Sequence, residues 1–555
     1  MSMSRSGSGP GSGSDSDPAA PALGSSSSAK VMLQALLDAR AYRHRVYDLR
    51  IIETHISWVL LTGEFAYKIK KPVNLGFVDF STLTLRRQAC LDELRLNRRY
   101  APQLYLAVVP IGGTPEHPLV DDEGVPFEYA VKMRQFPSDQ QLDRLLADGH
   151  LDMGDIEELA ATIAALHAAA PVAPPDLPYG WPARIQTDVQ DNLRVLSAGS
   201  EGRLRAHIAD LAAWTRRQDA LLSSMMHSRR ESGHVREVHG DLHLANLVRL
   251  DKVIVAFDCI EFSAALRWND CISDLAFLTM DLHHRGHGDL AYHLLNRYLE
   301  IGGDYPGLSL LRYYEVYRAL VRAKVALLRR DASSGPERSA QARQCAAYVR
   351  LARRFSRGAC RALVLMHGLS GSGKTWLSTQ LMSALPAVRV RSDVERKRLH
   401  GLAEGAHSGS AVDAGLYDAT SSARTYDRLA ALVTDIIDAG ETAIVDATFL
   451  RSTDRLRFRV LAHRLAIPFA IVSCQAPASA LRGRLAARAR AGRDASEADQ
   501  RVLEHQCESA EALAADERSV TVHVMTEGLS DVGEVLARLR RILFGTADAA
   551  GAQTP

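Results

Sequence analysis

The spacing of apolar residues along the chain first predicts a short stretch of strands. Between Ala41 and Pro137, brief β-rich runs alternate with turn residues, and one longer run has helical spacing over 83–101. The residues Gly63 and Glu64 lie between the first two runs and predict a hairpin turn. The strands are expected over these residues: 54–63, 64–73, 104–112 and 127–136. This stretch therefore predicts a small β-rich lobe that carries one helix.

The next stretch, from 138 to 357, has mainly helical periodicity. Apolar residues recur at the spacing of one helix face, as in 155–170 and 311–330. A short strand-like interruption spans 235–262. The pattern predicts a helical lobe that contains a few short strands.

From Ala362 onward, apolar strand-like runs alternate with helical segments. The expected strands cover these residues: 362–368, 388–393, 442–448, 469–474 and 520–526. Alternation of this kind is typical of a parallel sheet covered by helices on both faces. Together the three stretches predict a multidomain fold that combines an α+β part with an α/β part built on a five-stranded parallel sheet.

Composition sets the expected limits of these parts. Residues 1–30 are mostly Ser, Gly, Pro and Ala, which cannot bury enough apolar surface to fold, so we expect a disordered leader. A similar tail is expected over 546–555. The first domain is then expected over 31–357, with lobes at about 41–137 and 138–357, and the second domain over 358–545.

Charge and cysteine content exclude several classes of protein. The 555 residues include 67 Lys and Arg against 65 Asp and Glu, so the net charge of +2 does not indicate a polycation that binds nucleic acid or anionic membrane. The seven cysteines form no C-x-x-C pair, which favours a reducing cytoplasm over a disulfide framework. No apolar run reaches the roughly 18 residues of a membrane span, so no membrane partner is expected.

The strongest motif lies between the first two strands of the third stretch. The segment GLSGSGKT matches G-x-x-x-x-G-K-[ST] and is flanked by a buried strand and a helix. Backbone N–H groups of such a loop surround phosphates, Lys374 reaches the β- and γ-phosphates, and the Thr375 hydroxyl ligates Mg²⁺. The loop residues predicted to bind the nucleotide are Gly368, Leu369, Ser370, Gly371, Ser372, Gly373, Lys374 and Thr375.

Other charged residues are predicted to complete this site. Asp446 ends an apolar strand and is the natural second group for Mg²⁺, whereas Asp393 ends another strand and could accept the proton of an acceptor hydroxyl. Ser392 and Arg396 flank Asp393 and are placed to contact the acceptor. Arg484 and Arg488 share one helix face and are predicted to neutralise transferring phosphate. They belong to a cluster of arginines: Arg482, Arg484, Arg488, Arg490 and Arg493.

Residues from about 360 to 545 resemble the AAA-type P-loop kinases that include polynucleotide 5′-hydroxyl kinases, zeta toxins and gluconate kinases. The resemblance is carried by GLSGSGKT, RSDVERKRL, AIVDATF and the arginine-rich segment. It implies ATP-dependent phosphorylation of a hydroxyl, with the acceptor undefined.

A second motif, VHGDLHLANLV, lies in the interruption of the helical stretch. Asp241 and Asn246 have the spacing of a kinase catalytic loop, in which the Asp orients or deprotonates the acceptor and the Asn holds Mg²⁺. Asp258 ends the strand that follows and is the second predicted metal ligand. Asn246 and Asp258 are expected to meet around one metal ion.

Upstream, the strand FAYKIKKPV offers the lysine that kinase folds place beside the phosphates. Lys68 fits the A-x-K pattern, while Lys70 points to the same face and is the alternative. The lysine should pair with a carboxylate on the next helix, for which Glu93 is the first candidate and Asp92 the second.

Residues from about 45 to 330 resemble the aminoglycoside phosphotransferase family. The resemblance is carried by HGDLHLANL, FDCIEF and SDLAF, in which Asp274 matches a family element. It implies a two-lobed protein-kinase-like fold with ATP in the cleft, Asp241 as catalytic base, and Asn246 and Asp258 as metal ligands. The chain departs from the kinase pattern in two places: no G-x-G-x-x-G precedes Lys68, and no glycine follows Asp258. Glu261 is the candidate for an auxiliary group at the metal site.

Both halves therefore predict an ATP- and Mg²⁺-dependent phosphotransferase that acts on a small-molecule hydroxyl. One alternative is that one half senses nucleotide and regulates the other, because the nucleotide loop before Lys68 is degenerate. A second alternative is that the P-loop half phosphorylates nucleic acid ends, which its arginine cluster suggests. Nucleic acid is the less favoured partner, because no aromatic and basic stripe accompanies the arginines.

Overall fold

The computed structural model describes residues 26–545 except 77, 359, 407–417, 492–494 and 530. The chain forms two compact units. The first unit consists of residues 1–138 and 256–264, and the second consists of residues 139–255 and 265–555. A short segment from the middle of the sequence, 256–264, thus belongs to the same unit as the N-terminal part.

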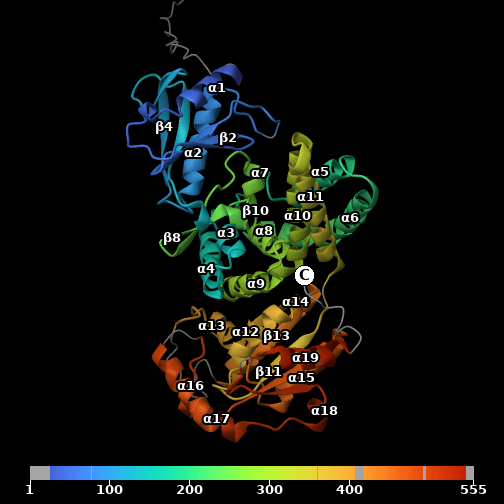
Figure 1. The fold of residues 1–555 in the computed structure, drawn as a ribbon. Helices are drawn as coiled ribbons and strands as arrows, with labels where there is room; N and C mark the ends of the chain where they lie inside the picture. Colours follow the sequence, from blue (N-terminus) through green and yellow to red (C-terminus); the bar gives the residue numbers. More distant parts are fainter. Residues whose placement is uncertain are drawn as a thin grey trace, which may run out of the picture. The chain divides into compact units, whose positions relative to one another are not determined.

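The first unit is built on an antiparallel six-stranded sheet. Its strand order is β1-β2-β3-β6-β4-β5. The strands are β1 (Arg50–Glu53), β2 (Ser57–Leu61), β3 (Phe65–Lys70), β4 (Tyr105–Thr114), β5 (His117–Val120) and β6 (Glu128–Arg134). Helix α2 (Leu83–Asn97) packs against β4 and β6 and is capped by the Thr82 hydroxyl (Figure 1). The four expected strands, the hairpin at Gly63 and the expected helix are all present.

Two strands and one helix of this unit lie where the pattern indicated no regular element. Strand β1 is mostly exposed and β5 has only four residues, so neither has a strong apolar signature. Helix α1 (Ser26–Ala35) includes the last five residues of the expected leader, and its Met32 is buried in the core beside β2 and β3. The remainder of the expected leader, residues 1–25, lies outside the described residues, as does the expected tail over 546–555.

Helices dominate residues 139–357, most of which belong to the second unit. They are α3 (Leu142–Ala147), α4 (Met153–Ala169), α5 (Pro182–Ala198), α6 (Gly202–Glu231), α7 (Ala264–Arg267), α8 (Cys271–His284), α9 (Gly288–Gly302), α10 (Leu308–Ala332) and α11 (Gly335–Arg357). The interruption consists of two short pairs: β7 (Val235–Glu237) with β10 (Trp268–Asp270), and β8 (Leu247–Leu250) with β9 (Val253–Ala256). Among the described residues, no helix is long and apolar enough to cross a membrane.

A five-stranded parallel sheet forms the remainder of the second unit, as expected. The strands are β11 (Leu363–His367), β12 (Ala387–Arg391), β13 (Thr442–Asp446), β14 (Phe469–Gln475) and β15 (Thr521–Met525). Their order is β12-β13-β11-β14-β15, and every pair is parallel. All five expected strands are present, which confirms the α/β prediction for this half.

Helices cover both faces of the parallel sheet (Figure 1). The helices of this part of the chain are α12 (Lys374–Ala384), α13 (Ser392–Leu399), α14 (Ala419–Asp438), α15 (Ser452–Arg464), α16 (Ala478–Ala491), α17 (Gln500–Ser509), α18 (Ala515–Arg518) and α19 (Gly533–Phe544). Helices α12 and α19 share one apolar core with alternate residues of the strands, while α14 packs against β12 and β13. Successive strand residues, such as Leu363 and Val364, are both fully buried, so the strands are apolar on both faces.

Glu315 on α10 is a buried carboxyl whose titration should make stability depend on pH. Burial raises the pKa of Glu315 to about 8, with a further rise from Glu441, although the Thr279 hydroxyl donates a 2.8 Å hydrogen bond to it. Between about pH 4.5 and pH 8 the folded chain therefore holds a proton on this carboxyl that the unfolded chain has lost. Its contribution to the free energy of unfolding falls as the pH rises through that window.

We expect Glu315→Gln to remove this dependence. The amide keeps an acceptor for Thr279 but cannot ionise, so the variant should match the wild type near pH 4 and be more stable near pH 9. The difference should grow by at most about 1.4 kcal/mol per pH unit inside the window. Urea unfolding at both pH values measures it, with the exposed Glu337→Gln as control. A wild type and a Glu315→Gln variant with the same pH dependence would contradict the prediction.

Candidate active sites

The phosphate loop connects β11 to α12 and depends on glycine at its tight points. Gly368, Gly371 and Gly373 have φ angles of 136°, 81° and 88°. A Cβ at Gly368 would lie 2.4 Å from the Cys474 carbonyl oxygen, and one at Gly371 would lie 2.9 Å from that of Leu481. Side chains at these positions would collide with backbone, so the motif's glycines are required by the local geometry.

Lys374 is the first residue of α12 and lies inside this loop. Its Nζ donates to the carbonyl oxygens of Gly368 and Leu369, both at 2.9 Å. Burial lowers the pKa of Lys374, and the nearby Asp446 and Asp393 carboxylates only partly oppose this effect. The ammonium is therefore desolvated and aligned with the loop.

Thr375 and Asp446 lie close together beneath the loop, where Mg²⁺ is predicted. The Ser378 hydroxyl contacts both, at 3.0 Å from the Thr375 carbonyl oxygen and 3.3 Å from Asp446 Oδ2. A hydroxyl and a carboxylate are hard oxygen donors of the kind that Mg²⁺ prefers. The donor set at this position therefore fits the ion.

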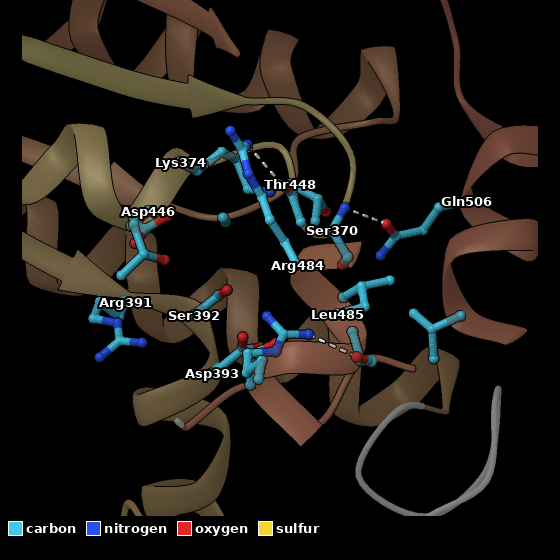
Figure 2. A pocket seen from close by; sticks show the side chains of 18 of the residues that line it. Ser370, Lys374, Arg391, Ser392, Asp393, Asp446, Thr448, Arg484, Leu485 and Gln506 are labelled. Atoms are coloured by element: carbon cyan, nitrogen blue, oxygen red, sulfur yellow. Dashed lines mark hydrogen bonds between the residues drawn. The ribbon is translucent and has the colours of Figure 1, made fainter. Parts of the chain in front are cut away.

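The loop opens into a pocket of about 260 Å³. Figure 2 shows Lys374, Asp446, Ser392 and Asp393 gathered around one hollow. Ser392 and Asp393 form the first turn of α13 at the carboxyl end of β12. Arg396, also predicted to contact the acceptor, lies one turn later and lines the same pocket. The structure thus brings together the loop lysine, the metal-side carboxylate and the predicted acceptor residues.

The two predicted arginines also line this pocket, but other groups already bind them. Arg484 donates from Nη1 to the Gly371 carbonyl oxygen at 3.1 Å and to the Thr526 hydroxyl at 2.9 Å. Arg488 donates to the Ala498 carbonyl oxygen at 2.6 Å. Arg484 is therefore hydrogen-bonded to the loop itself, whereas Arg488 is hydrogen-bonded to the segment that follows α16. Arg482 and Arg490 are exposed, and Arg493 lies outside the described residues.

One contact to the loop was not predicted. The Ser370 N–H donates to Gln506 Oε1 at 2.8 Å (Figure 2). A side chain of α17 therefore accepts a hydrogen bond from one of the loop N–H groups. A glutamine on an amphipathic helix 136 residues away carries no signal of this role in the sequence. Trp376, Tyr426 and Thr448 also line the pocket and were not predicted.

In the first unit, Lys68 has the pairing expected of a kinase lysine. Its Nζ lies 2.8 Å from Glu93 Oε1 and 2.5 Å from Asp258 Oδ1. Burial alone would lower the pKa of Lys68, but Asp258 and Glu93 raise it well above its ordinary value. The ammonium therefore stays charged and links the helix α2 carboxylate to the predicted metal ligand. Asp92, the second candidate partner, is not in this cluster.

Lys70, the alternative to Lys68, has a separate partner in the same cluster. It contacts the other Glu93 oxygen, Oε2, at 2.5 Å and also pairs with Glu261. The side chains of Lys70 and Glu93 are fully buried. Glu261, expected as an auxiliary metal-site group, is thus bound to Lys70. Glu93 pairs with both lysines. Lys68 links it to Asp258, and Lys70 links it to Glu261, which are the two acidic residues of the segment 256–264.

Backbone contacts hold that segment in an unusual conformation. Asp258 has a φ angle of +62°, a left-handed value that is uncommon for residues other than glycine. The Asp258 N–H donates to the Tyr105 hydroxyl at 3.0 Å, and the Cys259 N–H donates to Asn97 Oδ1 at 2.9 Å. These contacts show how the chain turns here without the glycine of the kinase pattern.

The predicted catalytic loop lies in the second unit. Asn246 Nδ2 donates to Asp241 at both its carbonyl oxygen (3.0 Å) and Oδ2 (3.1 Å). Asp274 Oδ1 and Oδ2 accept the N–H groups of Gly240 (2.9 Å) and His239 (3.1 Å). Asp274, whose side chain is almost completely buried, therefore fixes the loop that carries Asp241. Asn246 and Asp258 belong to different units.

Two basic side chains, His243 and Arg322, lie near Asp241. Burial would raise the pKa of Asp241, but His243 and Arg322 hold it well below its ordinary value. His243 Nε2 lies 3.5 Å from Asp241 Oδ2 and 3.4 Å from Arg322 Nη1. Asp241 is therefore ionised at neutral pH, as a group that orients or accepts a proton must be. Neither His243 nor Arg322 was among the predicted site residues.

Comparison with known proteins finds a family model in the second half and relatives that match most of the chain. Residues 363–513 match a family model described as an AAA domain, which confirms the AAA-type resemblance of the second half. The chain is also 29% identical over 473 residues to an uncharacterized protein of Mycobacterium tuberculosis (strain H37Rv). That match covers 83% of this chain and 91% of the mycobacterial protein, and a protein of Mycobacterium bovis matches equally.

Three solved structures are similar to parts of this chain. A choline/ethanolamine kinase family protein from Mesorhizobium loti is 13% identical and covers 58% of this chain and 99% of its own, with a TM-score of 0.36. A putative kinase from Chloroflexus aurantiacus is 20% identical and covers 33% and 98%, with a TM-score of 0.28. A gluconokinase from Sinorhizobium meliloti is 18% identical and covers 33% and 90%, with a TM-score of 0.23. Since these scores are below 0.5, the fold assignment rests on the sheet topology above.

The two buried lysines of the first unit should differ in their contribution to stability. Replacing Lys70 by Met removes a fully buried cation from Glu261 and Glu93, which should cost about 3–5 kcal/mol of unfolding free energy. Lys68→Met leaves Lys70 on Glu93 and leaves Asp258 partly exposed to water, so its cost should be about 1 kcal/mol or less.

Urea unfolding of the full chain measures this difference in stability. ATP binding to the same variants separates the contribution of each lysine to stability from its contribution to nucleotide binding. We expect Lys68→Met to weaken nucleotide binding in the first half while the fold persists. Equal losses of stability in the two variants would contradict the distinction.

Proposed function

We propose that the chain is a phosphotransferase with two sites, each of which transfers the γ-phosphate of ATP to a hydroxyl of a small molecule. The observation that carries the proposal is the pocket that joins Lys374, Asp446 and Asp393, because these are the three groups that in-line phosphoryl transfer needs. We place the first site in a domain over 31–357 and the second in a domain over 358–545.

At the phosphate-loop site, each residue has a defined task. Lys374 and the loop N–H groups bind the phosphates, and Thr375 and Asp446 would hold Mg²⁺, which neutralises the charge on the transferring group. Asp393 accepts the proton of the acceptor hydroxyl at the carboxyl end of β12. Arg488 faces the same pocket and stabilises charge on the moving phosphate, while Arg484 keeps the loop in place.

At the kinase-type site, Lys68 aligns phosphates and is itself aligned by Glu93. Asp241 orients the acceptor hydroxyl and accepts its proton, and the low pKa that His243 and Arg322 impose keeps it ionised. The predicted metal ligands Asn246 and Asp258 carry an amide and a carboxylate oxygen, which are donors that suit Mg²⁺.

A screen of purified protein against hydroxyl compounds tests the proposal. ADP release is measured with ATP and Mg²⁺ on panels of sugars, sugar acids, polyols and amino alcohols, and products are confirmed by mass. We expect Lys374→Ala to abolish one activity and Asp241→Ala to abolish the other, each by about 100-fold or more, because a phosphate-binding charge or a proton acceptor is lost.

The variants also discriminate between the other functions considered. ATP binding in the first half without transfer, combined with an ATP-dependent rate at the second site, would favour a regulatory module. Labelling of a 5′-hydroxyl oligonucleotide that requires Lys374 would instead favour a polynucleotide kinase, and its absence at low salt would exclude that activity. No turnover of any hydroxyl compound by either site would contradict the proposal.

A further inference from the structure

Helix α9, which precedes the phosphate-loop domain in sequence, is bonded to the edge strand of its sheet. The Asn296 side chain donates from Nδ2 to the Ala387 carbonyl oxygen at 2.9 Å and accepts the Arg389 N–H at 2.6 Å. Asn296 is fully buried. A single amide thus satisfies two outward backbone groups of β12, which an edge strand would otherwise expose.

One turn further along α9, Glu300 binds the side chain of Arg389. The Arg389 Nε and Nη2 atoms donate to Glu300 Oε1 at 3.0 and 2.6 Å. The two side chains are 7% and 2% exposed, so the pair is shielded from water. Burial would raise the pKa of Glu300, but Arg389 and Arg391 hold it below its ordinary value. Glu300 is therefore a carboxylate that fixes the orientation of the Arg389 guanidinium.

The remaining nitrogen of Arg389 points at the phosphate-loop helix. Nη1 donates to the Thr379 hydroxyl at 2.6 Å, to the Thr375 carbonyl oxygen at 3.3 Å and to the Ser378 hydroxyl at 3.3 Å. Ser378 in turn lies 3.3 Å from Asp446 Oδ2. Arg389 therefore contacts Thr375 directly and Asp446 through one hydroxyl.

We infer that Glu300 and Arg389 are positioning residues of the phosphate-loop site, and that α9 is a structural part of that site. The inference rests on the proposed function, in which Thr375 and Asp446 would hold Mg²⁺. Arg389 fixes the first turn of α12 and, through Ser378, the Asp446 carboxylate, while Glu300 fixes Arg389. Groups that orient metal ligands from behind commonly change metal affinity by about 10–100-fold when they are removed.

The test measures ATP binding by calorimetry with and without Mg²⁺ in the full chain. A background with Lys68→Met and Asp241→Ala weakens the other site, and Lys374→Ala identifies the binding that belongs to the phosphate loop. In this background we expect Glu300→Gln to weaken ATP binding in the presence of Mg²⁺ by about tenfold or more. Binding of ATP without Mg²⁺ should change by less than about twofold, because Lys374 and the loop N–H groups do not touch Glu300.

Glu441→Gln is the matched control. Glu441 Oε2 accepts a 2.8 Å hydrogen bond from the Tyr292 hydroxyl of α9, and Oε1 lies 3.3 Å from Arg312 of α10. It is a buried carboxylate that joins the helical region to the same sheet domain. Since no described contact links Glu441 to α12 or Arg389, its substitution should leave both ATP affinities unchanged.

Ser378→Ala keeps the test decisive if Glu300→Gln does not fold. It removes the hydroxyl between Arg389 and Asp446 without altering α9, and it should weaken only the Mg²⁺-dependent binding. Wild-type affinities in both Glu300→Gln and Ser378→Ala would overturn the inference, as would equal losses with and without Mg²⁺, which indicate a merely structural role. ATP binding that survives Lys374→Ala would instead overturn the proposed function of this site, because that binding would not belong to the phosphate loop. Lys374→Ala therefore tests the proposed function, and the comparison with and without Mg²⁺ tests the inference separately.

Discussion

Every predicted site in this chain depends on the same constraint, that an ionised side chain removed from water must be met by opposite charge or by hydrogen-bond donors. Glu93 meets it with two lysines, Asp274 with two backbone N–H groups and His167, and Glu300 with Arg389. In each case the compensating groups are also the ones that locate a site residue. The partners of a buried carboxylate have little freedom to move, because any displacement leaves a charge without compensation.

Helix α9 shows how this constraint connects distant parts of one unit. Its Tyr298 hydroxyl lies 2.9 Å from His167 Nδ1, and His167 Nε2 lies 3.3 Å from the Asp274 carboxylate that holds the predicted catalytic loop. Its Asn296 and Glu300 bind β12 and Arg389. One helix therefore contacts the supports of two predicted sites, through three buried polar residues that lie within about one turn of each other. Buried polar networks of this kind favour one arrangement over others because partial satisfaction is costly.

Much of the fold and part of the sites followed from local pattern. The five strands of the parallel sheet and the glycines of the loop were predicted because burial on two faces and positive φ angles restrict which residues are allowed. Asp241 and Asn246 were predicted because five residues separate them within one loop. By contrast, β1 and β5 lacked an apolar signature, and nothing near Gln506 marks it as a partner of the loop. Lys68 and Lys70 show where prediction from the sequence ended. Strand periodicity placed both lysines on one face but could not predict which carboxylate each would bind.

The sequence by itself therefore determined most of the elements, the phosphate loop and the residues that are candidates for phosphoryl transfer. These properties depend on neighbours within a few positions, where backbone geometry and side-chain size act directly. Only the tertiary structure decided that Glu261 binds Lys70, that Arg484 is attached to the loop, and that Arg389 stands between Glu300 and Thr375. Each of these contacts joins residues that are distant in sequence. Many charged residues could satisfy any one buried charge, and packing alone selects among them.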